Sequence, residues 1–173
     1  MLLSYGLRLA TAASMTAASG IAFSRTAGAA RCDAAPSFVT VSALTTTGAE
    51  KAMAAAKAEA EKNGWKVTIV IADASGTPLL LSRDGASPMT VDIAMGKART
   101  AAISGKESGV FESIVNGGEA RPRLALLSAP LLLMEGAVPI LVDGVVAGSI
   151  GVSGVRSDQD AAVAKAGAAA LFA

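Results

Sequence analysis

The sequence predicts an α+β domain in which helices pack on an antiparallel sheet of about five strands. Short turns such as Asp73–Gly76 and Asp143–Gly144 join runs of branched residues in pairs, which is typical of β-hairpins. Segments with apolar residues three and four apart are fewer than these runs, so the chain has too few crossover helices for a parallel sheet.

The folded domain is expected at residues 44–173, and it begins with an amphipathic helix. Thr45–Thr47 supplies N-cap residues, and Asn63–Gly64 ends the helix because glycine readily adopts a left-handed conformation. The predicted buried face is mostly alanine, so this helix must lie very close to its partner. Its members are Ala49, Ala52, Met53, Ala56 and Ala60.

Residues 65–72 and 77–83 alternate and are predicted to form a strand pair. Pro88 suits the first turn of a second helix, with Ser87 as its cap. This helix is expected to run to about Ser104 and to stop at Gly105.

The rest of the chain predicts a short helix at residues 108–115, an irregular connection from 121, and strands at 131–134, 138–142 and 145–152. Gly144 is expected to need a positive φ in the hairpin turn. The glycines between Gly148 and Gly154 suggest close approach of a helix or of a neighbouring subunit. Ser157 and Asp160 predict a variant capping box before a closing helix at 161–172.

Composition excludes several classes of function. The chain has no histidine and one cysteine, which excludes a Ser-His-Asp triad, histidine-based zinc or haem ligation and an internal disulfide. The net charge of +1 provides no basic face for nucleic acid, and we expect no metal site. No apolar run reaches about 18 residues, so we expect no stable membrane insertion.

Residues 1–32 differ from the rest, because they contain Arg8, Arg25 and Arg31 but no acidic residue. Two targeting interpretations remain open: a secretory signal with an apolar region at 9–23, or an organelle transit peptide. An unprocessed tail is the third alternative. Residues 33–43 are predicted to be a linker, so the mature protein would be secreted, periplasmic or organellar.

The second predicted helix carries the main candidate site. Asp92 and Arg99 share one face, and Lys97 lies on another side, where it is a candidate for meeting an anionic ligand. The alternative is a solvated helix face. Met95 and Met134 are possible soft ligands for haem iron, but a place in the core is the favoured interpretation.

Three segments together resemble one family. Residues 92–101 (DIAMGKARTA) resemble its helix motif, residues 135–154 its hairpin signature, and residues 157–167 its closing helix. This is the GlcG/HbpS-like family, also called the haem-binding or haem-degrading domain, which is similar to the C-terminal domain of PduO-type cobalamin adenosyltransferases. The resemblance covers about residues 44–172.

The resemblance implies the α+β fold, homo-oligomers and haem or tetrapyrrole binding. Without histidine, any haem ligand must be weak: Lys97, Thr100, a methionine or none. Residues 104–130 resemble the family poorly, and Arg83-Asp84 lacks the methionine that usually stands between these two positions. Asp73 and Asp158 also match its recurring polar positions. The predicted ligand-binding residues are Arg83, Asp92, Lys97, Thr100 and Glu135.

Three functions therefore stay open. The first is an oligomeric protein that binds a small ligand, haem or a tetrapyrrole. The second is a structural or regulatory assembly domain without catalysis. The third is an enzyme acting on a small organic acid, in which Lys97 or Arg83 binds a carboxylate and Glu135 or Asp92 serves as acid or base. No catalytic set is predicted.

Overall fold

The computed structural model describes residues 41–117 and 123–173. The predicted targeting segment and most of the linker lie outside the described residues. The elements are α1 (Thr46–Lys62), β1 (Thr68–Asp73), β2 (Pro78–Arg83), α2 (Thr90–Ser104), α3 (Ser108–Asn116), the 3-10 helix η1 (Leu124–Ser128), β3 (Ala137–Val142), β4 (Val145–Ser153), α4 (Ser157–Ala169) and the 3-10 turn η2 (Ala170–Phe172).

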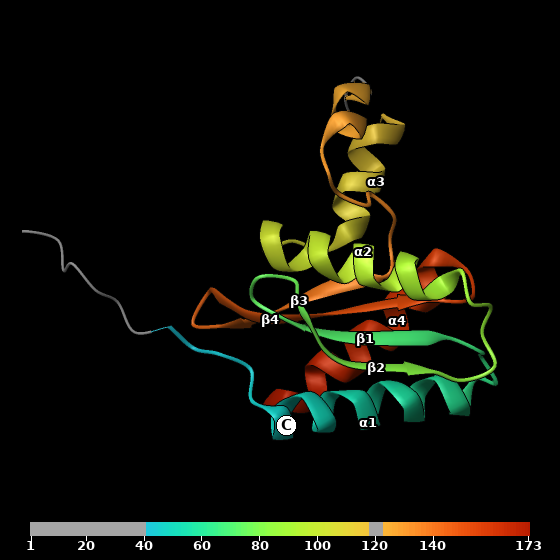
Figure 1. Cartoon of the computed structure of the whole chain (residues 1–173), viewed down its shortest axis with the longest axis vertical. Helices are drawn as coiled ribbons and strands as arrows, with labels where there is room; N and C mark the ends of the chain where they lie inside the picture. The colour runs from blue at the N-terminus through green and yellow to red at the C-terminus, as the bar shows by residue number, and fades with distance from the viewer. Residues whose placement is uncertain (1–40, 118–122) are drawn as a thin grey trace, which may run out of the picture. The chain divides into compact units, whose positions relative to one another are not determined.

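The described residues form a sheet of four strands in the order β2-β1-β4-β3, and every pair is antiparallel. Helices α1 and α4 cover one face of this sheet, and α2 covers the other (Figure 1). The α+β class is therefore confirmed. Both predicted hairpins form, with β1 paired to β2 and β3 paired to β4.

The fifth strand predicted at residues 131–134 does not form. The backbone of Leu132 instead bonds to a side chain of α2: its carbonyl accepts from Thr100 Oγ1 at 2.9 Å, and its N–H donates to the same atom at 3.1 Å. These bonds satisfy the backbone groups of Leu132 without a neighbouring strand. An apolar run of four residues does not by itself separate a strand from such a packed segment.

Small residues bring α2 and the sheet into close contact. A Cβ on Gly151 would collide with the carbonyl oxygen of Ala94 and would lie 2.6 Å from the backbone nitrogen of Ala98. On the other face, Ala49, Ala52 and Ala56 of α1 are fully buried in the core that the sheet shares with α4. Gly151 therefore serves the helix contact that the sequence offered as one alternative, and Gly148 lies against the backbone of β1.

Most of the predicted caps and turns are confirmed, but the predicted Ser87 cap of α2 is wrong, because the helix begins at Thr90 after Met89 and has no side-chain cap. Thr45 caps α1 by accepting from the N–H of Gly48 at 3.1 Å, and Gly64, Gly105 and Gly144 all have positive φ. The capping box expected from Ser157 and Asp160 is wrong. The N–H of Arg156 donates to Gln159 Oε1 at 3.2 Å, and this leaves Asp160 free to point inward.

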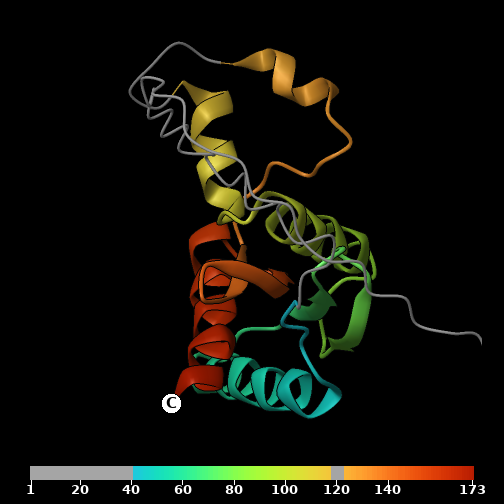
Figure 2. The same ribbon diagram turned by 90° about the vertical axis from the view of Figure 1, so that its left-hand side faces the viewer.

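Helix α3 and η1 stand away from the sheet above α2 (Figures 1 and 2). We call residues 108–117 and 123–134 the arm. Within it, Ser108 alone is buried among the described residues.

Candidate functional site

Lys97, the predicted anion-binding residue, lies inside the protein. Its side chain is 1% exposed, and its Nζ donates to Asp160 Oδ2 at 2.9 Å and to the carbonyl of Val152 at 3.0 Å. The backbone of Gly136 closes over the pair, since a Cβ there would lie 2.6 Å from Lys97 Nζ. Lys97 therefore joins α2 to α4 and β4 and is not offered to a ligand.

Sequence reasoning missed Asp160 as the partner of Lys97. Its other carboxylate oxygen, Oδ1, accepts the N–H of Val155 at 3.2 Å. Burial raises the pKa of Asp160, and the hydrogen bond from the Lys97 ammonium offsets part of that rise. A signal was available: Lys97 lies in the alanine stripe of α2, and Asp160 precedes the apolar stripe of α4.

Thr100 and Glu135 hold the base of the arm. Thr100 is fully buried and, besides its two bonds to Leu132, donates to the carbonyl of Gly96 at 3.0 Å. The backbone N–H of Glu135 donates to the carboxylate of Glu112 on α3. Thr100 thus has a structural role, and Glu135 is tied to α3 through its backbone N–H.

Arg83 lies on a face of β2 that α2 leaves open. Arg83 pairs with Thr68, and Leu81 pairs with Val70. Thr68 Oγ1 lies 2.6 Å from Thr90 Oγ1 on α2, so this side of the sheet is the α2 side. Because α2 packs over β1, β3 and β4, Leu81 remains 46% exposed beside it.

Asp92 faces the same region from α2. It lines an open groove of about 350 Å³ with Met95, Gly96 and Arg99, against the β1–β2 turn. The turn touches the helix, since a Cβ on Gly76 would lie 2.9 Å from the Cα of Arg99. We call these residues together the α2–β2 surface. Its members are Gly76, Thr77, Pro78, Leu81, Arg83, Asp92, Met95, Gly96 and Arg99.

The β1–β2 turn that borders the groove is fixed by Asp73. Its Oδ1 accepts from the backbone N–H groups of Ser75 at 2.8 Å and Thr77 at 2.9 Å, and from Ser75 Oγ at 2.7 Å. The hydrogen bond from the Ser75 hydroxyl and the other donors of the turn lower the pKa of Asp73. Asp73, one of the predicted polar positions, therefore fixes the turn that borders the α2–β2 surface.

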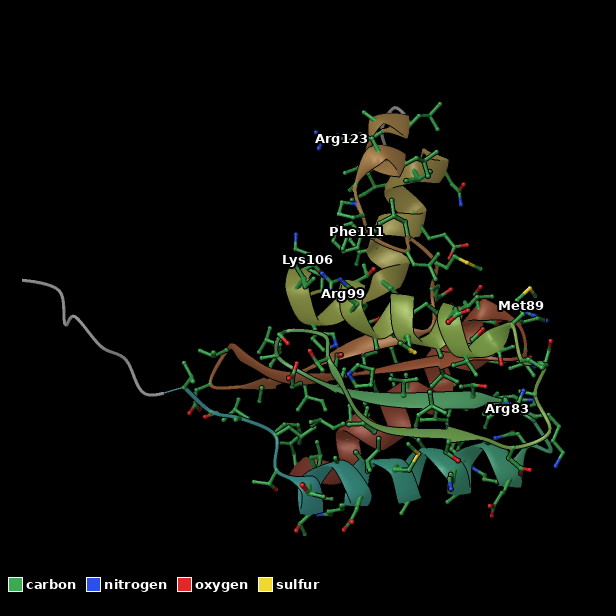
Figure 3. All side chains as sticks on the ribbon, in the orientation of Figure 1. Arg83, Met89, Arg99, Lys106, Phe111 and Arg123 are labelled. Carbon is green, nitrogen blue, oxygen red and sulfur yellow. The ribbon has the colours of Figure 1, made fainter. Side chains whose placement is uncertain are left out.

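The α2–β2 surface is apolar in the middle and charged at its ends. Arg83 lies beyond the end of α2 where Met89 stands, and Arg99 lies toward the other end (Figure 3). Leu81 and the half-buried Met95, which packs against Val70 and Ala72, lie on the same surface. This arrangement suits a flat, largely apolar ligand that carries carboxylates.

The five predicted site residues therefore do not form one site. Arg83 and Asp92 share the α2–β2 surface, whereas Lys97, Thr100 and Glu135 bind other parts of the chain. Of the residues considered for an enzyme, Asp92 lines the groove and Arg83 does not. The sequence had placed Arg99 on the same helix face as Asp92, and Met95 is the one candidate soft donor that lines the groove.

Two further findings concern the described residues. Within residues 41–117 and 123–173, no group of three or more Asp, Glu or Cys side chains is arranged to hold a metal ion. No helix in the same part of the chain has the length and apolarity needed to cross a membrane.

Comparison with known proteins gives a consistent result. A family model described as "Haem degrading protein HbpS-like" matches residues 44–169. Protein GlcG of Escherichia coli K12 is 47% identical over 103 residues, which cover 58% of this chain and 74% of GlcG.

Solved structures share the fold. The crystal structure of HbpS matches with a TM-score of 0.68 and 29% identity, covering 77% of this chain and 93% of HbpS. A structure described as a PduOC:heme complex matches with a TM-score of 0.66 and 27% identity, covering 74% of this chain and 94% of PduOC.

Proposed function

Because this chain belongs to the HbpS-like family of haem degrading proteins, we propose that it is a homo-oligomeric protein that binds haem or a related tetrapyrrole. The observation that carries the proposal is the α2–β2 surface, which combines the exposed Leu81, the half-buried Met95 and the exposed Arg83 and Arg99. The PduOC structure, which was determined as a haem complex, supports a tetrapyrrole as the ligand class.

The residues of this surface fit the chemistry of haem in two respects. Haem is a planar apolar macrocycle with two carboxylates, and guanidinium groups bind carboxylates through paired, charge-assisted hydrogen bonds. Leu81 and Met95 would contact the macrocycle, and Arg99 would bind the carboxylates, which lie together on one edge of the macrocycle; Arg83 would lie at the opposite end of the surface. Asp92 lies about 10 Å from Arg99 along the helix, so its negative charge need not meet the carboxylate that Arg99 binds.

The chain has no histidine, so iron ligation cannot follow the common histidine mode. Met95 is the methionine on this surface and would supply a sulfur donor. We therefore infer that apolar contact and carboxylate binding provide most of the affinity, and that binding is weak and readily reversed. This favours transfer or sensing of the ligand over permanent retention.

A haem titration monitored by the Soret absorbance tests the proposal. Arg99→Gln should weaken binding about tenfold, because a hydrogen bond to a charged group contributes about 1.5–3 kcal/mol and 1.4 kcal/mol is a factor of ten. Arg156→Gln is the matched control, because Arg156 is exposed and pairs with Asp158 on α4. Equal weakening in both variants, or none, would contradict the site.

A second titration tests the sulfur donor. Met95→Leu keeps the apolar volume but removes the thioether, so the Soret band of bound haem should move while binding persists. Met134→Leu, at the foot of the arm, is the control and should leave the band in place. A band that moves with Met134→Leu would assign the donor to Met134 and reject Met95.

A non-catalytic assembly domain is the second candidate, and the exposed arm favours it. In that case the protein would form a stable oligomer, and a haem titration would give no saturable change in the Soret absorbance.

A further inference from the structure

The arm exposes apolar side chains along its length. Val110 is 43% exposed, Leu124 is 62% exposed and Leu127 is 64% exposed. Phe111 and Ile114 on α3 are also only partly buried. Several exposed apolar side chains on one projecting element are typical of a surface where another molecule binds.

The arm is held firmly where it joins the body. The hydroxyl of Ser108 accepts the N–H of Ala137 at 3.0 Å, and Thr100 bonds Leu132 on the returning segment. Across the arm, the N–H of Arg123 donates to the carbonyl of Ile114 at 3.2 Å. The arm is therefore tied to the body at its base, and its ribbon projects away from the sheet (Figure 2).

The charged residues of the arm indicate which kind of partner binds it. Among its described residues, Glu112 and Arg123 are the charged ones, and Glu112 accepts the N–H of Glu135 at the base. Nucleic acid and anionic membranes require a basic surface, which this near-neutral arm does not provide. A second copy of the chain offers an equally neutral, apolar arm, and interfaces between permanently associated subunits are more apolar than transient ones.

Two copies of the same arm would meet in a symmetric contact. A two-fold arrangement lets one apolar face meet an identical face and closes the assembly without leaving a free surface.

We propose that the arm is a subunit-contact element, in which residues 108–117 and 123–134 of one protomer pack against the arm of a second copy around a two-fold axis. This inference rests on the proposed homo-oligomer and names the surface that forms it. It also assigns the subunit contact to the arm and not to the glycine-rich strand β4, whose glycines lie against other parts of the same chain.

Light scattering coupled to size-exclusion chromatography, on the full chain without haem, tests the arm. Leu127→Glu should reduce the oligomer to half its mass or less, because a buried charge without a partner disfavours the interface. Phe172→Glu is the matched control, because Phe172 is 63% exposed and lies at the other end of the fold, after α4. It should leave the mass unchanged.

The outcomes separate the two proposals. A wild-type chain that is monomeric at micromolar concentration overturns both the homo-oligomer and the arm contact. A wild-type oligomer that persists in Leu127→Glu, or that dissociates equally in Phe172→Glu, overturns the arm contact alone. Far-UV circular dichroism checks the fold, and if Leu127→Glu fails to fold, Leu127→Ser takes its place with the same expected loss of mass.

Discussion

At the scale of single residues, the same kinds of side chain serve different purposes according to burial. Lys97 and Asp160 are charged yet almost fully buried, and each is the other's partner. Arg83 and Arg99 remain at the surface of the described domain, where carboxylates can reach them. The proposed ligand contact therefore uses an exposed arginine, whereas the buried ion pair holds α2 against α4 and β4.

Breaking the buried pair should destabilise the fold strongly. Lys97→Met leaves the Asp160 carboxylate buried without its cation, and loss of one partner of such a pair costs about 3–5 kcal/mol. Replacing both residues, as in Lys97→Met with Asp160→Leu, should recover much of that loss. Urea unfolding measures each variant, and a loss under about 1 kcal/mol for Lys97→Met would contradict the structural role.

Asp73 and Asp160 should titrate in opposite directions from the ordinary value of 3.8. The pKa of Asp73 is lowered, so its contribution to stability is present above 3.8 and is lost as pH falls through the folded value. The pKa of Asp160 is raised, so folding favours its protonated form, and that contribution is largest below 3.8 and is lost as pH rises through the folded value. Carbon-detected NMR of the two carboxyl groups measures both; equal pKa values would contradict the two environments.

At the scale of elements, the close packing of α2 on the sheet depends on Gly151, a position with no room for a side chain. Sequence patterns predicted four helices, two hairpins and the glycine turns, because these features depend on local periodicity and backbone conformation. The extra strand at 131–134 was wrong, since Thr100, distant in the sequence, satisfies the backbone of Leu132. The partner of Lys97 was missed for the same reason, because contacts between distant residues leave little local signal.

Gly151→Ala should weaken the packing of α2 on β4. The added Cβ would overlap the backbone of Ala94 and Ala98, and overpacking of this kind costs about 1–3 kcal/mol. Gly144→Asn is the control: Gly144 has a φ of +79° with open space around it, and asparagine tolerates that conformation. Thermal unfolding compares the two, and equal melting temperatures would show that α2 can move away from β4 without cost.

At the scale of the whole molecule, the α+β domain, the α2–β2 surface and the arm divide the proposed tasks. The sheet and its alanine-rich helices form a close-packed body with few large side chains. That body leaves an apolar, arginine-flanked surface on one side and an apolar arm above α2. The proposal assigns ligand binding to the first and subunit contact to the second.

The proposed removal of the targeting segment belongs to this scale. We predict that the native protein begins near residues 33–44, just before the domain starts at Leu44, whose N–H bonds the carbonyl of Ala147 at 3.1 Å. N-terminal sequencing of protein from its own source checks this. A native chain that begins at Met1 would contradict processing and leave the unprocessed tail as the explanation.

Native mass spectrometry of the protein purified from its own source tests the central claim most directly, because one spectrum reports ligand and subunit number together. The account predicts an oligomer whose mass exceeds that of its chains by one or more tetrapyrroles, with the excess lost at higher collision energy because the ligand is held without histidine. Recombinant protein to which haem is added should show the same additional mass, and the Arg99→Gln variant should show less of it. An oligomer that carries no tetrapyrrole, and that takes up none when haem is added, would contradict the claim that this protein binds one.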